Sequence, residues 1–251
     1  MSTNNKFDPG LAGVLAAETT LSHVDGLKGE LIIAGFPLDR LAANATFEEA
    51  TYLLWHGRLP TQTELDDLKQ ELAELRPLPL ATLNLLREAA QVRTTPMDAL
   101  RMAAATLDLG SGETDNLTTA NTIVARVASI VASYHRLRRG EEPIAPDPTL
   151  SHAANYLYML TGTPPSDARV RGLETYLNTI IDHSLNASTF AARVIVATQT
   201  DLVSAITGAI GALKGPLHGG APGPALETVF EIGTADRAEA VLQAKLDAGE
   251  R

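Results

Sequence analysis

Hydrophobic positions along most of the chain recur at the three- and four-residue spacing of amphipathic helices. The clearest stripe is formed by four leucines within residues 65–75. It follows a capping box made by Thr61 and Glu64, and Pro77 ends it. A similar capping pattern, Thr46-Phe47-Glu48-Glu49, opens the preceding helix. Residues 46–77 are therefore predicted to form short helices with clear starts and ends.

The rest of the chain continues in the same way, apart from a short β segment near its start. Residues 11–36 are rich in Val, Ile, Thr and Leu and are broken by Asp25-Gly26 and Lys28-Gly29, which predicts short strands joined by a tight turn. Three prolines within residues 140–148 predict an extended connection across the surface of one domain. We expect further helices over residues 80–92, 96–109, 117–139, 150–160, 166–181, 187–198, 202–213, 224–230 and 235–246. The predicted fold class is all-α with a short N-terminal β element.

Composition narrows the classes of function. The 251 residues are 45% hydrophobic, which is enough for a substantial core, and their formal net charge of -10 disfavours a general attraction to nucleic acid or to an anionic membrane. The absence of cysteine excludes disulfides, thiolate metal sites and cysteine nucleophiles. The start of the chain is polar, and no apolar stretch approaches the roughly 20 residues that span a bilayer. We expect a cytoplasmic protein without a membrane span.

Polar residues gather at one point between two apolar helices, in the segment Asp182-His183-Ser184-Leu185-Asn186-Ala187-Ser188-Thr189. On spacing alone, capping of helix ends by Asp182, Asn186 or Ser188 is the simpler interpretation, because Asx and Ser residues at helix ends are usually caps. The alternative is a polar ligand site that uses His183.

A second segment, Lys214-Gly215-Pro216-Leu217-His218-Gly219-Gly220-Ala221-Pro222, places a lone histidine among glycines. Glycine lets backbone and ligand approach the imidazole closely, although three glycines and two prolines would equally make an ordinary turn. If a helix follows, the positive end of its dipole favours a neutral imidazole that can donate a hydrogen bond to a carbonyl.

Other kinds of site find little support. The sequence has no His-x-x-x-His pair, no carboxylate cluster beside His183 or His218, and no phosphate-binding glycine motif after a strand. The basic run at residues 134–139 is best explained as complementation of a helix dipole. We expect His23, His56 and His152 to be structural.

Over essentially its whole length, the chain resembles the bacterial citrate synthases and 2-methylcitrate synthases. The two histidine motifs are the most specific part of the resemblance. The matching motifs are Leu11-Ala12-Gly13-Val14, Thr46-Phe47-Glu48-Glu49, Tyr52-Leu53-Leu54-Trp55, Ala154-Asn155-Tyr156-Leu157-Tyr158-Met159-Leu160, Asp182-His183, Asn186-Ala187-Ser188-Thr189 and Gly215-Pro216-Leu217-His218-Gly219-Gly220-Ala221.

The resemblance implies a dimeric, mostly helical acyltransferase that condenses acetyl-CoA with oxaloacetate. By motif matching, His183 binds oxaloacetate with Asn186 in the same pocket, and His218 is the catalytic histidine that stabilises the enol of the acyl-CoA. Such a donor is needed because a thioester α-proton is so weakly acidic that a carboxylate removes it only when the developing enolate oxygen is stabilised.

The resemblance also implies a set of partners and a division into domains. Leu217, Gly219 and Gly220 are expected on the coenzyme A side, with the CoA thioester as a cosubstrate, no tightly bound cofactor and no metal. We assign residues 1–219 to a large helical domain and residues 220–251 to the beginning of a small one. Apolar helices over residues 80–109 and 202–213 predict a homodimer.

The family's next motif, Gly-Phe-Gly-His-Arg-Val-Tyr, carries substrate ligands and precedes the aspartate base, and it is expected after Arg251. Because Glu227 and Glu231 are predicted to be solvated, we expect this chain alone not to form citrate at an enzymatic rate. A catalytically silent helical partner subunit is the competing interpretation. The sequence does not decide between acetyl-CoA and propionyl-CoA, since one methylene changes binding by only about 1–3 kcal/mol.

Overall fold

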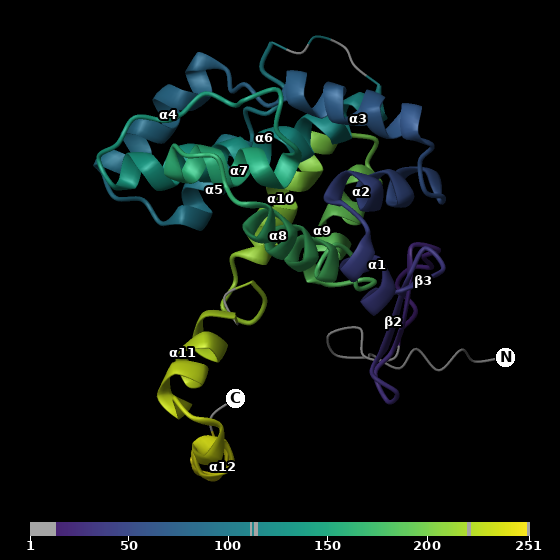
Figure 1. The fold of residues 1–251 in the computed structure, drawn as a ribbon, viewed down its shortest axis with the longest axis vertical. Coiled ribbons are helices and arrows are strands. Elements are labelled where there is room, and N and C mark those ends of the chain that lie inside the picture. Colours follow the sequence, from purple (N-terminus) through teal and green to yellow (C-terminus); the bar gives the residue numbers. More distant parts are fainter. Residues whose placement is uncertain (1–13, 111, 113–114, 220–221, 250–251) are drawn as a thin grey trace, which may run out of the picture.

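The computed structural model, drawn in Figure 1, describes residues 14–110, 112, 115–219 and 222–249. It begins with a three-stranded antiparallel sheet whose strands lie in chain order: β1 (Ser22–Asp25), β2 (Glu30–Ile33) and β3 (Phe36–Pro37). The Asp25 carboxylate accepts a backbone hydrogen bond of 3.1 Å from Lys28 and stabilises the turn between the first two strands.

Helices make up most of the remainder of the described chain, with one short 3₁₀ helix, η2 (Ala235–Arg237), among them. The α-helices are α1 (Leu38–Asn44), α2 (Phe47–His56), α3 (Gln62–Leu75), α4 (Leu80–Gln91), α5 (Pro96–Ala104), α6 (Asn116–Arg138), α7 (His152–Thr161), α8 (Asp167–Thr179), α9 (Ala187–Val196), α10 (Leu202–Leu213), α11 (Pro222–Ile232) and α12 (Ala238–Asp247).

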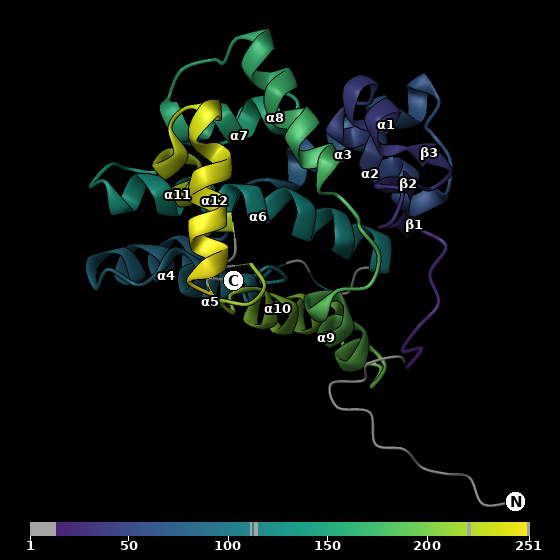
Figure 2. The same ribbon diagram turned by 90° about the horizontal axis from the view of Figure 1, so that it is seen from below.

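Helix α6 crosses the middle of the molecule, and α3, α4, α5, α7 and α10 pack around it (Figures 1 and 2). Helix α10 lies between α5 and α9 and packs against both. Helices α11 and α12 stand apart from this body and pack on each other (Figure 1). The predicted boundary between residues 219 and 220 falls just before this pair, and it stays a prediction.

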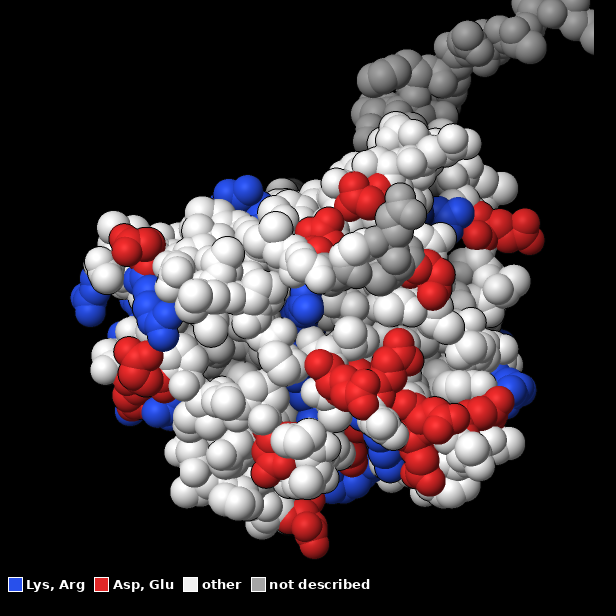
Figure 3. Space-filling view, turned by 90° about the horizontal axis from the view of Figure 1, so that it is seen from above, with Lys and Arg blue, Asp and Glu red and all other residues white. Residues whose placement is uncertain are grey.

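Acidic side chains form a broad band across the face shown in Figure 3, in keeping with the net charge of -10. Basic side chains lie beside this band and do not form a comparable patch on the same face. None of the helices in the described part of the chain is long and apolar enough to cross a lipid bilayer.

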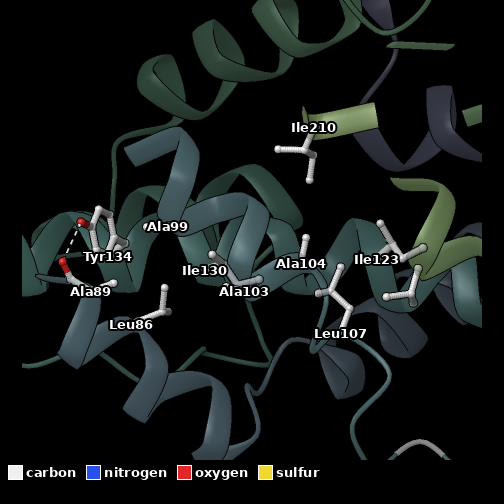
Figure 4. Close-up of a cluster of buried hydrophobic side chains, with 11 residues drawn as sticks. Leu86, Ala89, Ala99, Ala103, Ala104, Leu107, Ile123, Ile130, Tyr134 and Ile210 are labelled. Atoms are coloured by element: carbon white, nitrogen blue, oxygen red, sulfur yellow. Dashed lines mark hydrogen bonds between the residues drawn. The ribbon is translucent and has the colours of Figure 1, made fainter. Parts of the chain in front are cut away.

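The main hydrophobic core lies between α4, α5, α6 and α10, and Figure 4 shows its buried side chains. At one end of it, the Tyr134 hydroxyl lies 3.4 Å from the carbonyl oxygen of Ala89 and donates to that of Thr94 at 2.5 Å. Helix α10 contributes Val203 and Ile210 to this core. The helix that leads to His218 is therefore anchored by apolar burial along its length.

The structure confirms the all-α fold class with its small N-terminal sheet. Both predicted capping boxes are present, with Thr46 and Thr61 each accepting the backbone N–H of the glutamate three residues later. The prediction of a helix over residues 96–109 was wrong at its end, because α5 stops at Ala104 and turns follow. Thr106 hydroxyl donates at 2.7 Å to the carbonyl of Ala103, a local bond that competes with helix continuation.

Candidate functional site

The segment that carries His183 is held at its beginning by apolar packing and at its end by a helix cap. Ile181 packs against the buried cluster that joins β2 to α1 and α2. The Asp182 carboxylate accepts the backbone N–H of Ser184 at 3.1 Å, and Ser184 has a left-handed φ of 74°. The turn that results leaves the side chain of His183 exposed. An exposed imidazole at a fixed position is available to a ligand.

Asn186 is the N-cap of α9, so the capping interpretation of this segment is confirmed for that residue. Its Oδ1 accepts the backbone N–H of Thr189 at 2.9 Å, and the Ser188 hydroxyl lies 2.7 Å from the same oxygen. In the described part of the chain no hydrogen bond uses Nδ2 of Asn186. Capping occupies the oxygen of the amide and leaves its two N–H donors for a ligand.

Residues 215–219, which carry His218, form a turn, one of the two interpretations that the sequence left open. The backbone N–H of His218 donates to the carbonyl of Gly215 at 3.0 Å, and that of Gly219 donates to the carbonyl of Leu213 at 2.8 Å. A Cβ at Gly219 would collide with that same carbonyl oxygen and with the Leu213 side chain. Glycine is therefore required by close backbone approach.

The start of this turn is tied to another helix. Lys214, at the C-terminal end of α10, forms an ion pair with Asp98 in the first turn of α5. The hydrogen bond from Lys214 holds the pKa of the Asp98 carboxyl below its ordinary value. Because Asp98 also accepts from the hydroxyl of Thr95, the N-cap of α5, its position is fixed on both sides.

The two predicted histidine motifs meet through one residue. Nε2 of His218 lies 3.0 Å from the hydroxyl oxygen of Ser188, although the residues are 30 positions apart. The packing of α9 against α10 brings the N-terminal end of one helix beside the turn that ends the other. The Ser188 hydroxyl can donate its single proton either to Nε2 of His218 or to Oδ1 of Asn186. His218, Ser188 and Asn186 therefore form one hydrogen-bonded group.

From the sequence, Ser188 was named as a possible cap and as part of the motif over residues 186–189, and its contact with His218 was not predicted. The only local signal is its place two residues after an N-cap asparagine; the contact itself depends on how α9 and α10 pack. No hydrogen bond among the described residues joins His183 to this group. Leu217 is fully exposed and Gly219 is exposed, while Gly220 lies outside the described residues.

The remaining predicted residues take no part in this group. The ring of His56 lies against Tyr52, with 4.0 Å between ring centroids, and the ring of His152 is buried against Phe47. Glu231 is exposed and forms an ion pair with Lys245 at 2.9 Å. No hydrogen bond or ion pair in the described chain joins a carboxylate to the ring of His218.

Comparison with known proteins gives concordant matches. The family model described as "Citrate synthase, C-terminal domain" matches residues 10–251. Citrate synthase of Haloferax volcanii is 42% identical over 96% of this chain, which spans 66% of that protein. For 2-methylcitrate synthase of Mycobacterium tuberculosis the identity is 41%, over 94% of this chain and 61% of the relative. The chain thus spans somewhat less than two thirds of the length of these relatives.

Solved structures agree with the sequence matches. A structure described as the ternary complex of carboxymethyl coenzyme A and oxaloacetate with citrate synthase from Thermoplasma acidophilum superimposes with a TM-score of 0.88. Its sequence identity is 28%, over 98% of this chain and 66% of that one.

Proposed function

Because the chain belongs to the citrate synthase family, we propose that it condenses acetyl-CoA with oxaloacetate to give citrate and coenzyme A. The observation that carries this proposal is the hydrogen-bonded group of His218, Ser188 and Asn186, with separations of 3.0 Å and 2.7 Å. It joins two motifs that are distant in sequence and that the reaction needs side by side: a donor for the thioester oxygen and a donor for the keto acid.

We propose that His218 stabilises the enol or enolate of the acyl-CoA. A neutral imidazole donates from Nδ1 only when Nε2 accepts, and this requires the Ser188 hydroxyl to turn its single proton from Oδ1 of Asn186 to Nε2 of His218. The proton on Nδ1 is then available to the thioester oxygen as charge develops there. The group that removes the α-proton is not proposed among the acids of α11, since Glu227 and Glu231 are exposed.

Oxaloacetate is proposed to bind between His183 and Asn186. The imidazole of His183 is exposed and the amide of Asn186 retains its N–H donors, so both can donate to a dicarboxylate. The coenzyme A side is proposed at Leu217, Gly219 and Gly220; of these, Leu217 and Gly219 flank His218 and are exposed. The named complex of the Thermoplasma enzyme, which holds a CoA analogue and oxaloacetate, supports this pair of ligands.

A second candidate is the condensation of propionyl-CoA to 2-methylcitrate, which the match to a 2-methylcitrate synthase favours. The two acyl groups differ by one methylene, worth about 1–3 kcal/mol in a fitted pocket. Equilibrium titration of the chain with each acyl-CoA in the presence of oxaloacetate distinguishes the two without requiring turnover, since the preferred acyl-CoA should bind more tightly. We also propose a homodimer, since the apolar helix α9 has no buried residue and leaves Phe190, Val194 and Val196 exposed.

The oxaloacetate assignment is tested by calorimetric titration of His183→Ala. Loss of a hydrogen bond to a charged ligand costs about 1.5–3 kcal/mol, so affinity for oxaloacetate should fall roughly 10- to 100-fold while affinity for acyl-CoA is retained. His23→Ala, which removes an exposed imidazole from β1, is the matched control and should bind as wild type does. Equal losses for both ligands in His183→Ala would contradict the assignment.

A further inference from the structure

Two polar side chains of α8, Arg171 and Asn178, donate hydrogen bonds to the C-terminal end of α1. The Arg171 guanidinium donates to the carbonyl oxygen of Ala45 at 2.8 Å and also to that of Ala42. Asn178 Nδ2 donates to the same Ala45 oxygen at 2.8 Å. These carbonyls lie in the last turn and C-cap of α1, where no following helical turn supplies donors. A cation at this end is also favoured by the helix dipole.

The contact between α8 and α1 is buried at Asn178 and Glu174 and partly exposed at Arg171. Asn178 is 0% exposed and Glu174, one turn earlier on α8, is 6% exposed. Glu174 lies 3.3 Å from the Arg171 guanidinium and fixes its direction. The Ala45 oxygen accepts from both side chains, so each of the two donors contributes separately to holding α8 against the end of α1.

The same contacts set the position of the segment that carries His183. Helix α8 ends at Thr179, directly after Asn178. Ile181 then packs on the cluster that contains Leu41 and Ala45 of the α1 end. The chain from Asn178 to His183 is therefore fixed against α1 by a hydrogen bond and by an apolar contact. His218 depends on a different support, namely α10 and the ion pair between Lys214 and Asp98.

We propose that Arg171 and Asn178 are positioning residues for His183. By fixing the register of α8 against the end of α1, they place the imidazole where it meets the dicarboxylate substrate. This inference rests on the proposed function for the part played by oxaloacetate. The positioning itself is a property of the chain without ligand.

The test uses the imidazole region of the ¹H–¹⁵N NMR spectrum of the whole chain, with His183 and His218 assigned through His183→Gln and His218→Gln. In Asn178→Ala the His183 signal should shift by more than its line width or broaden, while the His218 signal stays in place. Thr179→Ala, which removes the neighbouring exposed hydrogen bond from Thr179 to the Thr175 carbonyl on the same helix, should leave both signals unchanged.

Arg171→Lys keeps the charge but cannot reach two carbonyls with one rigid group, so it should move the His183 signal in the same direction by a smaller amount. If Asn178→Ala does not fold, Arg171→Lys alone tests whether these contacts position His183. An unchanged His183 signal in a folded variant, or equal changes at both histidines, would overturn the proposal. Titration with oxaloacetate distinguishes failure of the proposed function from failure of the positioning role. A wild-type His183 signal that does not change on addition of oxaloacetate would refute the proposed function. The comparison of variants without ligand would still test whether Arg171 and Asn178 position His183.

Discussion

The imidazole of His152 is buried and stacks on the ring of Phe47, with 4.7 Å between centroids, and it is subject to the positive charge of Arg76. Desolvation, together with that charge, lowers the pKa of His152 to about 4. In the unfolded chain the pKa returns to about 6.5, so protons bind the unfolded state first. We therefore expect the free energy of unfolding to fall as the pH drops from about 6.5 to about 4, by on the order of 3 kcal/mol from this residue.

Urea unfolding at several pH values between 4 and 7 measures this dependence. His152→Gln retains a polar side chain without a titrating ring and keeps the backbone hydrogen bond from residue 152 to Glu48 Oε1, which is 2.8 Å long. Its free energy of unfolding should depend less on pH, because its unfolding should take up about one proton fewer than that of the wild type across this range. Parallel curves for wild type and variant would show that His152 does not bind the proton.

Gly219 lies so close to Leu213 that there is no space for a side chain at this position. In Gly219→Ala the new Cβ would collide with the backbone oxygen of Leu213, so the turn must shift and the hydrogen bond of 2.8 Å between these residues is strained. We expect a loss of about 1–3 kcal/mol in the free energy of unfolding and a displaced His218 imidazole signal by NMR. Gly223→Ala is the control, since a Cβ there meets open space. A wild-type His218 signal in Gly219→Ala would contradict the steric argument.

Among the elements, those with local signals were predictable from sequence and those held by distant contacts were not. Helices α2 and α3 begin at capping boxes, which are written within four consecutive residues. Helix α1 was missed. Its N-cap, Pro37, makes no side-chain cap, and its C-terminal carbonyls are satisfied by Arg171 and Asn178, which lie far along the chain. Only the folded chain brings these donors to it.

The candidate site follows the same rule. His183, Asn186 and His218 could be named from motifs, because polar and glycine-rich segments between apolar helices are visible in a single sequence. The bridge through Ser188 could not, since it depends on the packing of α9 against α10. The resemblance supplied the proposed roles of these residues. The structure shows that Ser188 links Asn186 to His218.

Helix α9 allows capping and ligand binding by Asn186 to be separated. Asn186→Asp keeps the oxygen that accepts from Thr189, and aspartate caps helices as well as asparagine does, so the free energy of unfolding should change by less than about 0.5 kcal/mol. The same substitution removes the N–H donors and adds a negative charge, so affinity for oxaloacetate should fall at least about tenfold. Thermal unfolding and calorimetry measure the two effects.

Asp201→Asn is the matched control for this change. Asp201 caps α10 by accepting the backbone N–H of Ser204 at 2.7 Å, and the substitution makes the reverse swap at an equivalent position. It should leave oxaloacetate affinity unchanged. Wild-type affinity in Asn186→Asp would remove Asn186 from the proposed site.

At the scale of the whole molecule, the placement of apolar surface is informative. Helix α9 is largely apolar, yet none of its residues is buried, and Phe190, Val194 and Val196 remain 36%, 54% and 38% exposed. It lies on the outside of α10, in the layer that α10 forms with α5 (Figure 2). The sequence predicted the dimer from apolar helices over residues 80–109 and 202–213, and this stays a prediction. Helix α10 buries Val203, Ala205 and Ile210 within its own chain, while the neighbouring α9 leaves apolar side chains uncovered. An apolar helix left uncovered on one face is typical of a surface that meets a partner.

We expect this surface of α9 to pack against a second copy of the chain, so that light scattering at micromolar concentration gives twice the chain mass. Val194→Glu would place a charge in the interface, and since burying an unpaired charge is costly, the dissociation constant should rise at least tenfold. Val92→Glu changes a similarly exposed valine, 75% accessible at the end of α4, and should leave the dimer intact. Val194 lies toward the end of α9 opposite to Asn186, so the variant should retain the hydrogen-bonded group around His218. A wild-type chain that is strictly monomeric at this concentration would contradict the dimer, and a dimer that tolerates Val194→Glu would move its interface away from α9.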